Sequence, residues 1–254
     1  MPGIKDSAAR LRFRDPQRLS LAFKNKSLLA LTGDSILDWT AIRLTLSLAT
    51  CTTAILFVLG LPLATWLARP GRGWRFVVEA VVALPLVLPP TVLGFYVLCA
   101  TGPRSVPGQW YSALFGSRLP FTFQGIVLAS VLYNLPFAVR PFTAALAAVD
   151  RKLVEASWCL GVSRFATFRR VTMPLAWKGI LAGLVLTFAH AVGEFGVVLM
   201  VGGAIPGVTR TLSVAIYEDV QALDYASANR SSLFLLAFAF VVLSALHLLQ
   251  RKPD

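Results

Sequence analysis

The stretch that decides the fold is residues 150–174, which read DRKLVEASWCLGVSRFATFRRVTMP. This stretch is polar and basic, and it lies between two long apolar runs at 119–139 and 175–201. A charged segment of this length between two apolar runs predicts a loop that joins two membrane spans.

Local signals divide this loop into short helices. Asp150 is an N-cap residue for a helix that begins directly after it, and Gly161 supplies the positive φ at which such a helix ends. Ser163 can cap a second piece, over 164–172, and Pro174 lies where the next span begins, a favoured place for proline. We therefore expect a short helix lying across one membrane face, held at both ends by spans.

The composition is that of a polytopic membrane protein. Of the 254 residues, 56% are hydrophobic and 14% are charged, and the mean hydropathy is +0.70. The formal charge of +12 does not indicate nucleic-acid binding, because most basic residues lie in short loops between apolar runs. Cys51, Cys99 and Cys159 lie far apart and form neither a metal-ligand pattern nor an obvious disulfide framework.

Five apolar runs are long enough to cross a bilayer, which takes about 20 helical residues. The predicted fold is therefore all-α, a bundle of five transmembrane helices over residues 36–250. The third run can continue as helix to residue 149, and Pro85, Pro89, Pro90 and Pro136 are expected to kink their helices. The runs are 44–67, 80–102, 119–139, 175–201 and 231–250.

The distribution of Lys and Arg predicts the orientation. Twelve basic residues lie in 69–75, 140–178 and the C-terminus, whereas the opposite loops carry four. By the positive-inside rule, the 150–174 loop and the C-terminus are cytoplasmic. Five spans then place the N-terminus outside.

The basic segment 1–35 conflicts with that placement, since a basic tail prefers the cytoplasm. A sixth span within 19–38 is one explanation, but Lys24, Lys26 and Asp34 disfavour it. Translocation of the tail despite its charge is another, and a start codon further downstream is a third. We expect a disordered or spurious extension rather than a sixth span.

The fourth run carries two ionisable residues, His190 and Glu194, four positions apart on one helix face. A bare carboxylate inside a membrane costs roughly 3 kcal/mol, so Glu194 must have a partner, line water or be protonated. A metal site is not expected, because no second pair of ligands occurs in the other spans. A structural pair near a translocation path is the favoured interpretation, and contact with substrate stays open.

Glu155-Ala156-Ser157, Gly161 and Val171-Thr172-Met173-Pro174 resemble the loop shared by the inner-membrane permeases of ABC importers. That family has Glu-Ala-Ala, then Gly, then Ile/Val-x-Leu-Pro, so Ser157 and Met173 are departures. The resemblance covers about residues 36–250. It implies a coupling helix that docks on a separate ATPase, and the chain itself has no G-x-x-x-x-G-K-[ST] loop for phosphate.

The same resemblance implies further properties. The permease would be a bacterial inner-membrane homodimer that binds two ATPase subunits and a periplasmic oxyanion-binding protein. ATP and Mg²⁺ would belong to the ATPase, and this chain would hold no cofactor. A surface charge paired with Arg151 or Lys152 is the alternative role for Glu155.

Gly193-Glu194-Phe195-Gly196, Ile205-Pro206-Gly207 and Thr209-Arg210-Thr211 are similar to the molybdate branch of these permeases. The departure is Ala204, where the branch often has Asn. Molybdate, or tungstate, is therefore the expected cargo, and a sulfate/thiosulfate permease or a secondary anion transporter is the alternative. The candidates for the translocation path are His190, Glu194, Phe195, Thr209, Arg210 and Thr211. For Arg210, an ion pair with Glu218 or Asp219 is the competing interpretation.

Overall fold

The computed structural model describes residues 37–69 and 73–250, and every regular element in these two ranges is a helix. The predicted all-α class is thus confirmed, while the expectation for residues 1–35 lies outside the described part. The helices are α2 (Trp39–Leu67), α3 (Arg75–Val87), α4 (Pro90–Thr101), α5 (Val106–Phe115), α6 (Phe123–Ala147), α7 (Arg151–Cys159), α8 (Arg164–Thr167), the π-helical turn η1 (Phe168–Thr172), α9 (Met173–Gly193), α10 (Gly196–Gly202), α11 (Leu212–Gln221) and α12 (Tyr225–Gln250).

By length and composition, the described residues contain four or five membrane spans. Four are single helices, and α3 with α4 forms a fifth only if this bent pair counts as one span. The four helices are Trp39–Leu67, Phe123–Ala147, Arg164–Gly193 and Tyr225–Leu246.

The second predicted span, 80–102, is broken and not merely kinked. The axes of α3 and α4 differ by 113°. Leu88 and Pro89 both have extended backbone, with ψ at 135° and 136°, and each precedes a proline, whose ring disfavours the helical conformation of the residue before it. Pro90 then starts α4 in the first turn, where a missing N–H costs nothing.

The fourth predicted span, 175–201, differs from the expectation at both ends. The helix is continuous from Arg164 through η1 into α9, so 164–172 is not a separate piece. In the π-helical turn, the Met173 N–H bonds the Phe168 carbonyl five residues back, and this wider turn accommodates Pro174, which has no N–H to donate. At the other end, α9 stops at Gly193, and Glu194 is extended before α10 begins.

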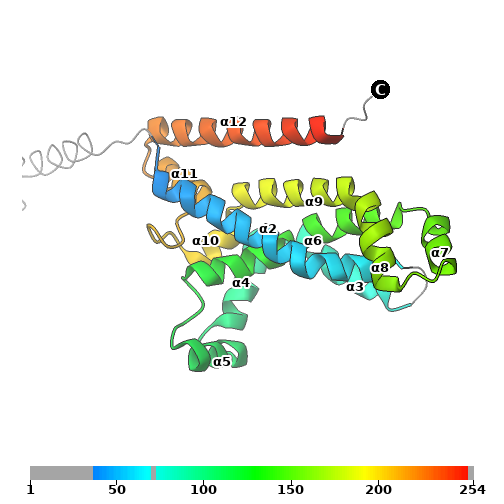
Figure 1. Cartoon of the computed structure of the whole chain (residues 1–254). Coiled ribbons are helices and arrows are strands. Elements are labelled where there is room, and N and C mark those ends of the chain that lie inside the picture. Colours follow the sequence, from blue (N-terminus) through cyan, green and yellow to red (C-terminus); the bar gives the residue numbers. More distant parts are fainter. Residues whose placement is uncertain (1–36, 70–72, 251–254) are drawn as a thin grey trace, which may run out of the picture. The chain divides into compact units, whose positions relative to one another are not determined.

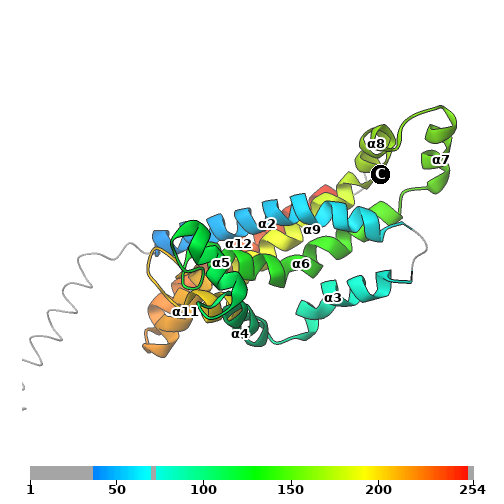
Figure 2. The same cartoon turned by 90° about the horizontal axis from the view of Figure 1, so that it is seen from below.

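α2, α6 and α9 pack side by side along their lengths (Figures 1 and 2). Leu56, Val139, Phe142 and Ile180 form the centre of this core. α7 lies at one end of these helices and α11 at the other (Figures 1 and 2). The loop of 150–174 therefore lies at one end of the bundle, and the segment after α10 lies at the opposite end.

A second core joins α4, α6 and α10, and Ile126 and Val201 lie within it. Here the backbones come close: a Cβ on Gly94 would lie 2.7 Å from the Met200 Cβ, and one on Gly196 would lie 2.9 Å from the Pro90 Cβ. The glycines are thus needed for α4 to pack against α10.

Candidate functional site

The predicted helix of the 150–174 loop is present as α7, with the expected caps. The Asp150 carboxylate accepts a hydrogen bond of 2.9 Å from the Lys152 N–H. Gly161 follows the helix with φ at 75°, and its N–H donates to the Trp158 carbonyl at 2.9 Å. This left-handed residue reverses the chain toward α8, which Ser163 caps by accepting from the Ala166 N–H.

Ser157, one of the two departures from the family pattern, has a structural partner. Its hydroxyl lies 2.8 Å from the Thr167 hydroxyl, and both residues are buried. The bond joins α7 to α8 across the turn at Gly161, so the loop is one folded unit. No local signal in the sequence pairs Thr167 with Ser157, because the two residues are ten positions apart.

The surface of this loop exposes several large apolar side chains among its charges. Leu160 is 83% exposed and Phe165 is 75% exposed, and Leu153 and Trp158 are about half exposed. The Arg164 guanidinium lies over the Trp158 ring, 5.8 Å from its centroid. Apolar side chains on a charged loop are typical of a docking surface for another protein.

The coupling-loop residues of the family pattern lie on both faces of this unit. Glu155 and Ala156 are exposed, and Glu155 has no ion-pair partner within 37–69 and 73–250. Val171 is half-buried in η1, and Pro174 is exposed at the start of α9. The alternative that Glu155 pairs with Arg151 or Lys152 is therefore not seen.

Glu194 lies in a buried network of polar side chains at the break between α9 and α10. It is 4% exposed, and its Oε2 accepts hydrogen bonds from the Ser130 hydroxyl at 2.6 Å and from the Asn134 Nδ2 at 2.7 Å. Its Oε1 is buried and has no hydrogen-bond partner among the described residues. Ser213 of α11 donates to the Glu194 carbonyl at 3.0 Å.

His190 joins this network through Asn134 and not through Glu194 directly. The His190 Nδ1 lies 2.9 Å from the Asn134 Oδ1. Because the Asn134 amide nitrogen donates to a carboxylate, its oxygen accepts, and His190 therefore carries its proton on Nδ1. Phe137 stacks on the imidazole with centroids 3.7 Å apart. The predicted His190–Glu194 pair is thus bridged by a residue from α6.

Arg210 forms ion pairs, as the competing interpretation expected. Its Nε lies 2.5 Å from the Glu218 Oε2, and its Nη1 lies 2.7 Å from the Asp38 Oδ2. Asp38 also caps α2 by accepting from the Ala41 N–H. One guanidinium therefore joins the start of α2 to α11, and its charge is balanced within the chain.

The neighbours of Arg210 are also engaged in internal structure. Thr209 is fully buried, and its hydroxyl donates to the Gly202 carbonyl at 2.6 Å. Thr211 is 1% exposed, and its hydroxyl has no partner among the described residues. Phe195 packs into the second core, with its ring 4.9 Å from that of Tyr217. The six predicted path residues thus form two groups, one at the α9–α10 break and one before α11.

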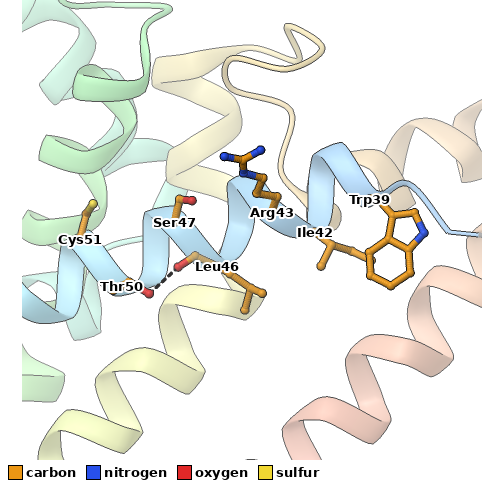
Figure 3. A pocket seen from close by; sticks show the side chains of 7 residues that line it. All are labelled: Trp39, Ile42, Arg43, Leu46, Ser47, Thr50 and Cys51. Carbon is orange, nitrogen blue, oxygen red and sulfur yellow. Dashed lines mark hydrogen bonds between the residues drawn. The ribbon is translucent and has the colours of Figure 1, made fainter.

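A separate groove of about 500 Å³ lies along the first half of α2 (Figure 3). Arg43 is exposed there and has neither an ion pair nor a hydrogen bond to any described residue. Arg43 precedes the apolar run predicted for this span, 44–67, but it lies within α2. Figure 3 shows the Arg43 and Ser47 side chains on the same side of α2.

No group of three or more potential metal-binding side chains occurs within 37–69 and 73–250. The three cysteines are free, and Cys99 and Cys159 are exposed.

A bundle of membrane spans with a folded, capped helix at one end is the architecture of a transport permease. The model of the family described as "Binding-protein-dependent transport system inner membrane component" matches residues 60–252. The chain belongs to this family, and it is therefore a multi-pass inner-membrane protein and the non-catalytic membrane subunit of an ABC transporter.

Curated relatives narrow the resemblance. The chain is 49% identical over 210 residues to the molybdenum transport system permease protein ModB of Azotobacter vinelandii, covering 83% of this chain and 93% of the relative. It is 34% identical to the protein of the same name from Escherichia coli, covering 82% and 91%. It is 32% identical to a probable sulfate transport system permease protein of Chlorella vulgaris, covering 73% and 70%.

Solved structures confirm the fold. A chain of a bacterial ABC transporter involved in the import of the acidic polysaccharide alginate superposes with a TM-score of 0.67 at 22% identity, covering 96% of this chain and 92% of that one. The MetNI methionine ABC transporter gives a TM-score of 0.64 at 21% identity, covering 83% and 95%.

Proposed function

We propose that the chain is the permease subunit that carries molybdate, or tungstate, across the inner membrane of a bacterium. The observation that carries this proposal is the 49% identity to a molybdenum permease over 93% of that relative's length. Two probable sulfate permeases are 32% and 33% identical to the chain, so the sulfate alternative is less well supported. Family membership sets the secondary-transporter alternative aside.

The proposed assembly contains two copies of this chain, two ATPase subunits and a periplasmic oxyanion-binding protein. α7 and the exposed apolar residues around it, Leu160 and Phe165, would dock on the ATPase. The excess of Lys and Arg around this loop supports a cytoplasmic position for it and for the C-terminus. ATP and Mg²⁺ would bind to the ATPase.

In this proposal α7 transmits the movement of the ATPase to the membrane spans. Of the family positions, Glu155, Ala156 and Ser157 lie in α7 and Gly161 follows it, whereas Val171 and Pro174 lie in η1 and at the start of α9. The Ser157–Thr167 hydrogen bond and the turn at Gly161 make α7 and α8 one body, and α8 continues without a break into the span of α9. A push on α7 by the ATPase would therefore move α9 directly.

The path itself is proposed to use hydroxyls and backbone amides more than fixed positive charge. Arg210 already pairs with two carboxylates. The Glu194 carboxylate accepts hydrogen bonds from Ser130 and Asn134, and a carboxylate has no donor to offer a dianion. Charge-assisted hydrogen bonds to a tetrahedral oxyanion are strong. A path that must release its anion does not need such a high-affinity site. His190, Phe195, Thr209 and Thr211 are the remaining path candidates.

The test is reconstitution of the chain with a candidate ATPase and binding protein in proteoliposomes. Molybdate-loaded binding protein should stimulate ATP hydrolysis and anion uptake, and sulfate-loaded protein should not. Stimulation by sulfate alone would replace molybdate by sulfate as the cargo. Transport by the purified chain without any ATPase would refute the importer assignment.

A further inference from the structure

The buried network around Glu194 lies at the junction of two packed units. On one side, α6 and α9 approach closely: a Cβ on Gly179 would lie 2.5 Å from the Ala145 Cβ, and one on Gly183 would lie 2.9 Å from the Phe142 ring. On the other side, α10 packs on α4 through the close contact at Gly94. Between the units, the helical backbone is interrupted at Glu194 and Phe195.

Both helices that leave the 150–174 loop meet again at this network. α6 contributes Ser130 and Asn134, and the end of α9 contributes Glu194. About 20 helical residues separate Glu194 from Pro174, which is roughly 30 Å at 1.5 Å per residue. The loop and the network are thus far apart, and the same two packed helices connect them (Figure 2).

We propose that Glu194 is a positioning residue. Its carboxylate ties the break between α9 and α10 to α6, so that a movement of α7 is transmitted to α10 and α4. This inference rests on the proposed function of the chain as an ATP-driven permease. Three elements meet at Glu194: its carboxylate binds α6, its carbonyl accepts from Ser213 of α11, and its backbone ends α9. Without these contacts of Glu194, the extended residues at the break would let α9 move while α10 stays in place.

The unused carboxylate oxygen explains why the residue is a glutamate. A carboxylate offers two equivalent oxygens and about four acceptor positions, and within the described part of the chain only Oε2 has hydrogen-bond partners. When α9 shifts against α6, Oε1 can take over one of the two donors, so the contact persists through the movement. An amide in the same place would hold one arrangement only, because its nitrogen cannot accept a hydrogen bond.

The difference between a carboxylate and an amide at residue 194 separates a positioning role from a merely structural one. In Glu194→Gln, the remaining oxygen can still accept from Ser130 and Asn134, so the variant should assemble and melt close to the wild type. If the exchange of oxygens matters, anion transported per ATP hydrolysed should fall at least fivefold. Basal ATP hydrolysis should stay within twofold, since the ATPase contacts are at the other end.

Ser130→Ala and Thr187→Val complete the experiment. Ser130→Ala removes one donor from the network. Thr187→Val is the matched control, because Thr187 is fully buried on α9 and, among the described residues, its hydroxyl bonds only the Gly183 carbonyl of its own helix. In the full complex with ATPase and binding protein, we expect Ser130→Ala to lower the transport ratio and Thr187→Val to leave it unchanged. The double variant Ser130→Ala/Glu194→Gln should be no worse than the more affected single variant.

An unchanged ratio in both Glu194→Gln and Ser130→Ala would overturn the inference, as would an equal loss in Thr187→Val. If a variant fails to assemble, hydrogen exchange of the backbone amides is measured on the purified chain. Ser130→Ala should accelerate exchange in the last turn of α9, residues 190–193. Unchanged exchange there would overturn the positioning role of Glu194. Failure of the proposed function is distinguishable, because the wild-type complex would then transport no oxyanion at all. A wild type that prefers sulfate leaves the test intact.

Discussion

Replacing Gly161 by valine should uncouple the permease from its ATPase without disturbing membrane insertion. Gly161 has φ at 75°, and a Cβ placed there meets no heavy atom within 4 Å. The penalty is therefore one of backbone conformation and not of packing. The left-handed conformation costs an L-residue about 1–2 kcal/mol, and a β-branched residue lies at the upper end.

A penalty of about 2 kcal/mol shifts the equilibrium away from the native turn roughly 30-fold. The turn sets the angle between α7 and α8, so its loss would move α7 while leaving the spans intact. Substrate-stimulated ATP hydrolysis in the reconstituted complex should therefore collapse toward the basal rate. Detergent size-exclusion and protease protection should show a normally inserted chain.

Gly161→Asn is the graded control for this experiment. Asparagine tolerates the left-handed region better than other non-glycine residues, so it should keep much of the stimulation. The expected order of stimulated rates is glycine, then asparagine, then valine. Stimulation of the valine variant equal to that of the wild type would refute the coupling role of the turn.

Three further outcomes are expected. Glu155→Lys should insert normally and lose stimulated ATP hydrolysis, because the exposed carboxylate has no partner in the described part of the chain; retained stimulation argues against a role at the ATPase surface. Ser157→Ala should lower stability by about 1–3 kcal/mol, since it leaves the buried Thr167 hydroxyl unpaired, and Ser157→Ala/Thr167→Val should recover most of it in thermal unfolding. Arg210→Lys and Asp38→Asn should each lower the free energy of unfolding by no more than about 1 kcal/mol, and by less at high salt, because these ion pairs are partly exposed. A loss of about 4 kcal/mol would show that Arg210 does more than join α2 to α11.

The loop was predictable because its signals are local. Asp150 and Gly161 act on the backbone within a few residues of themselves, and the structure places both as the caps of α7. The five apolar runs were recognisable for a similar reason, since length and hydropathy are properties of a contiguous segment. Pro89 and Pro90 likewise predicted a kink, because a proline acts on its own segment. The size of the bend was not predictable, since it depends on what α4 packs against.

The network around Glu194 was not predictable in the same way. The i, i+4 spacing suggested a direct pair with His190, yet the helix ends at Gly193, so Glu194 leaves the face that the spacing assumed. Its true partners, Ser130 and Asn134, lie 60 or more residues away in the chain. Their own spacing on α6 places them on one face, which is the only signal that a sequence could offer.

The two charged candidates for contact with the cargo share one property that bears on how such a permease works. Arg210 has its charge balanced by Asp38 and Glu218, and Glu194 has its carboxylate held by neutral donors within the bundle. The Arg210 guanidinium is therefore not free to bind a dianion strongly without first breaking an ion pair, and a carboxylate such as that of Glu194 has no hydrogen-bond donor to offer an oxyanion. Selection of the anion would then depend on the binding protein that delivers it. The permease would use these two charged side chains to fix the geometry of its helices, and a path of low affinity would release the anion each time the coupling helix moves.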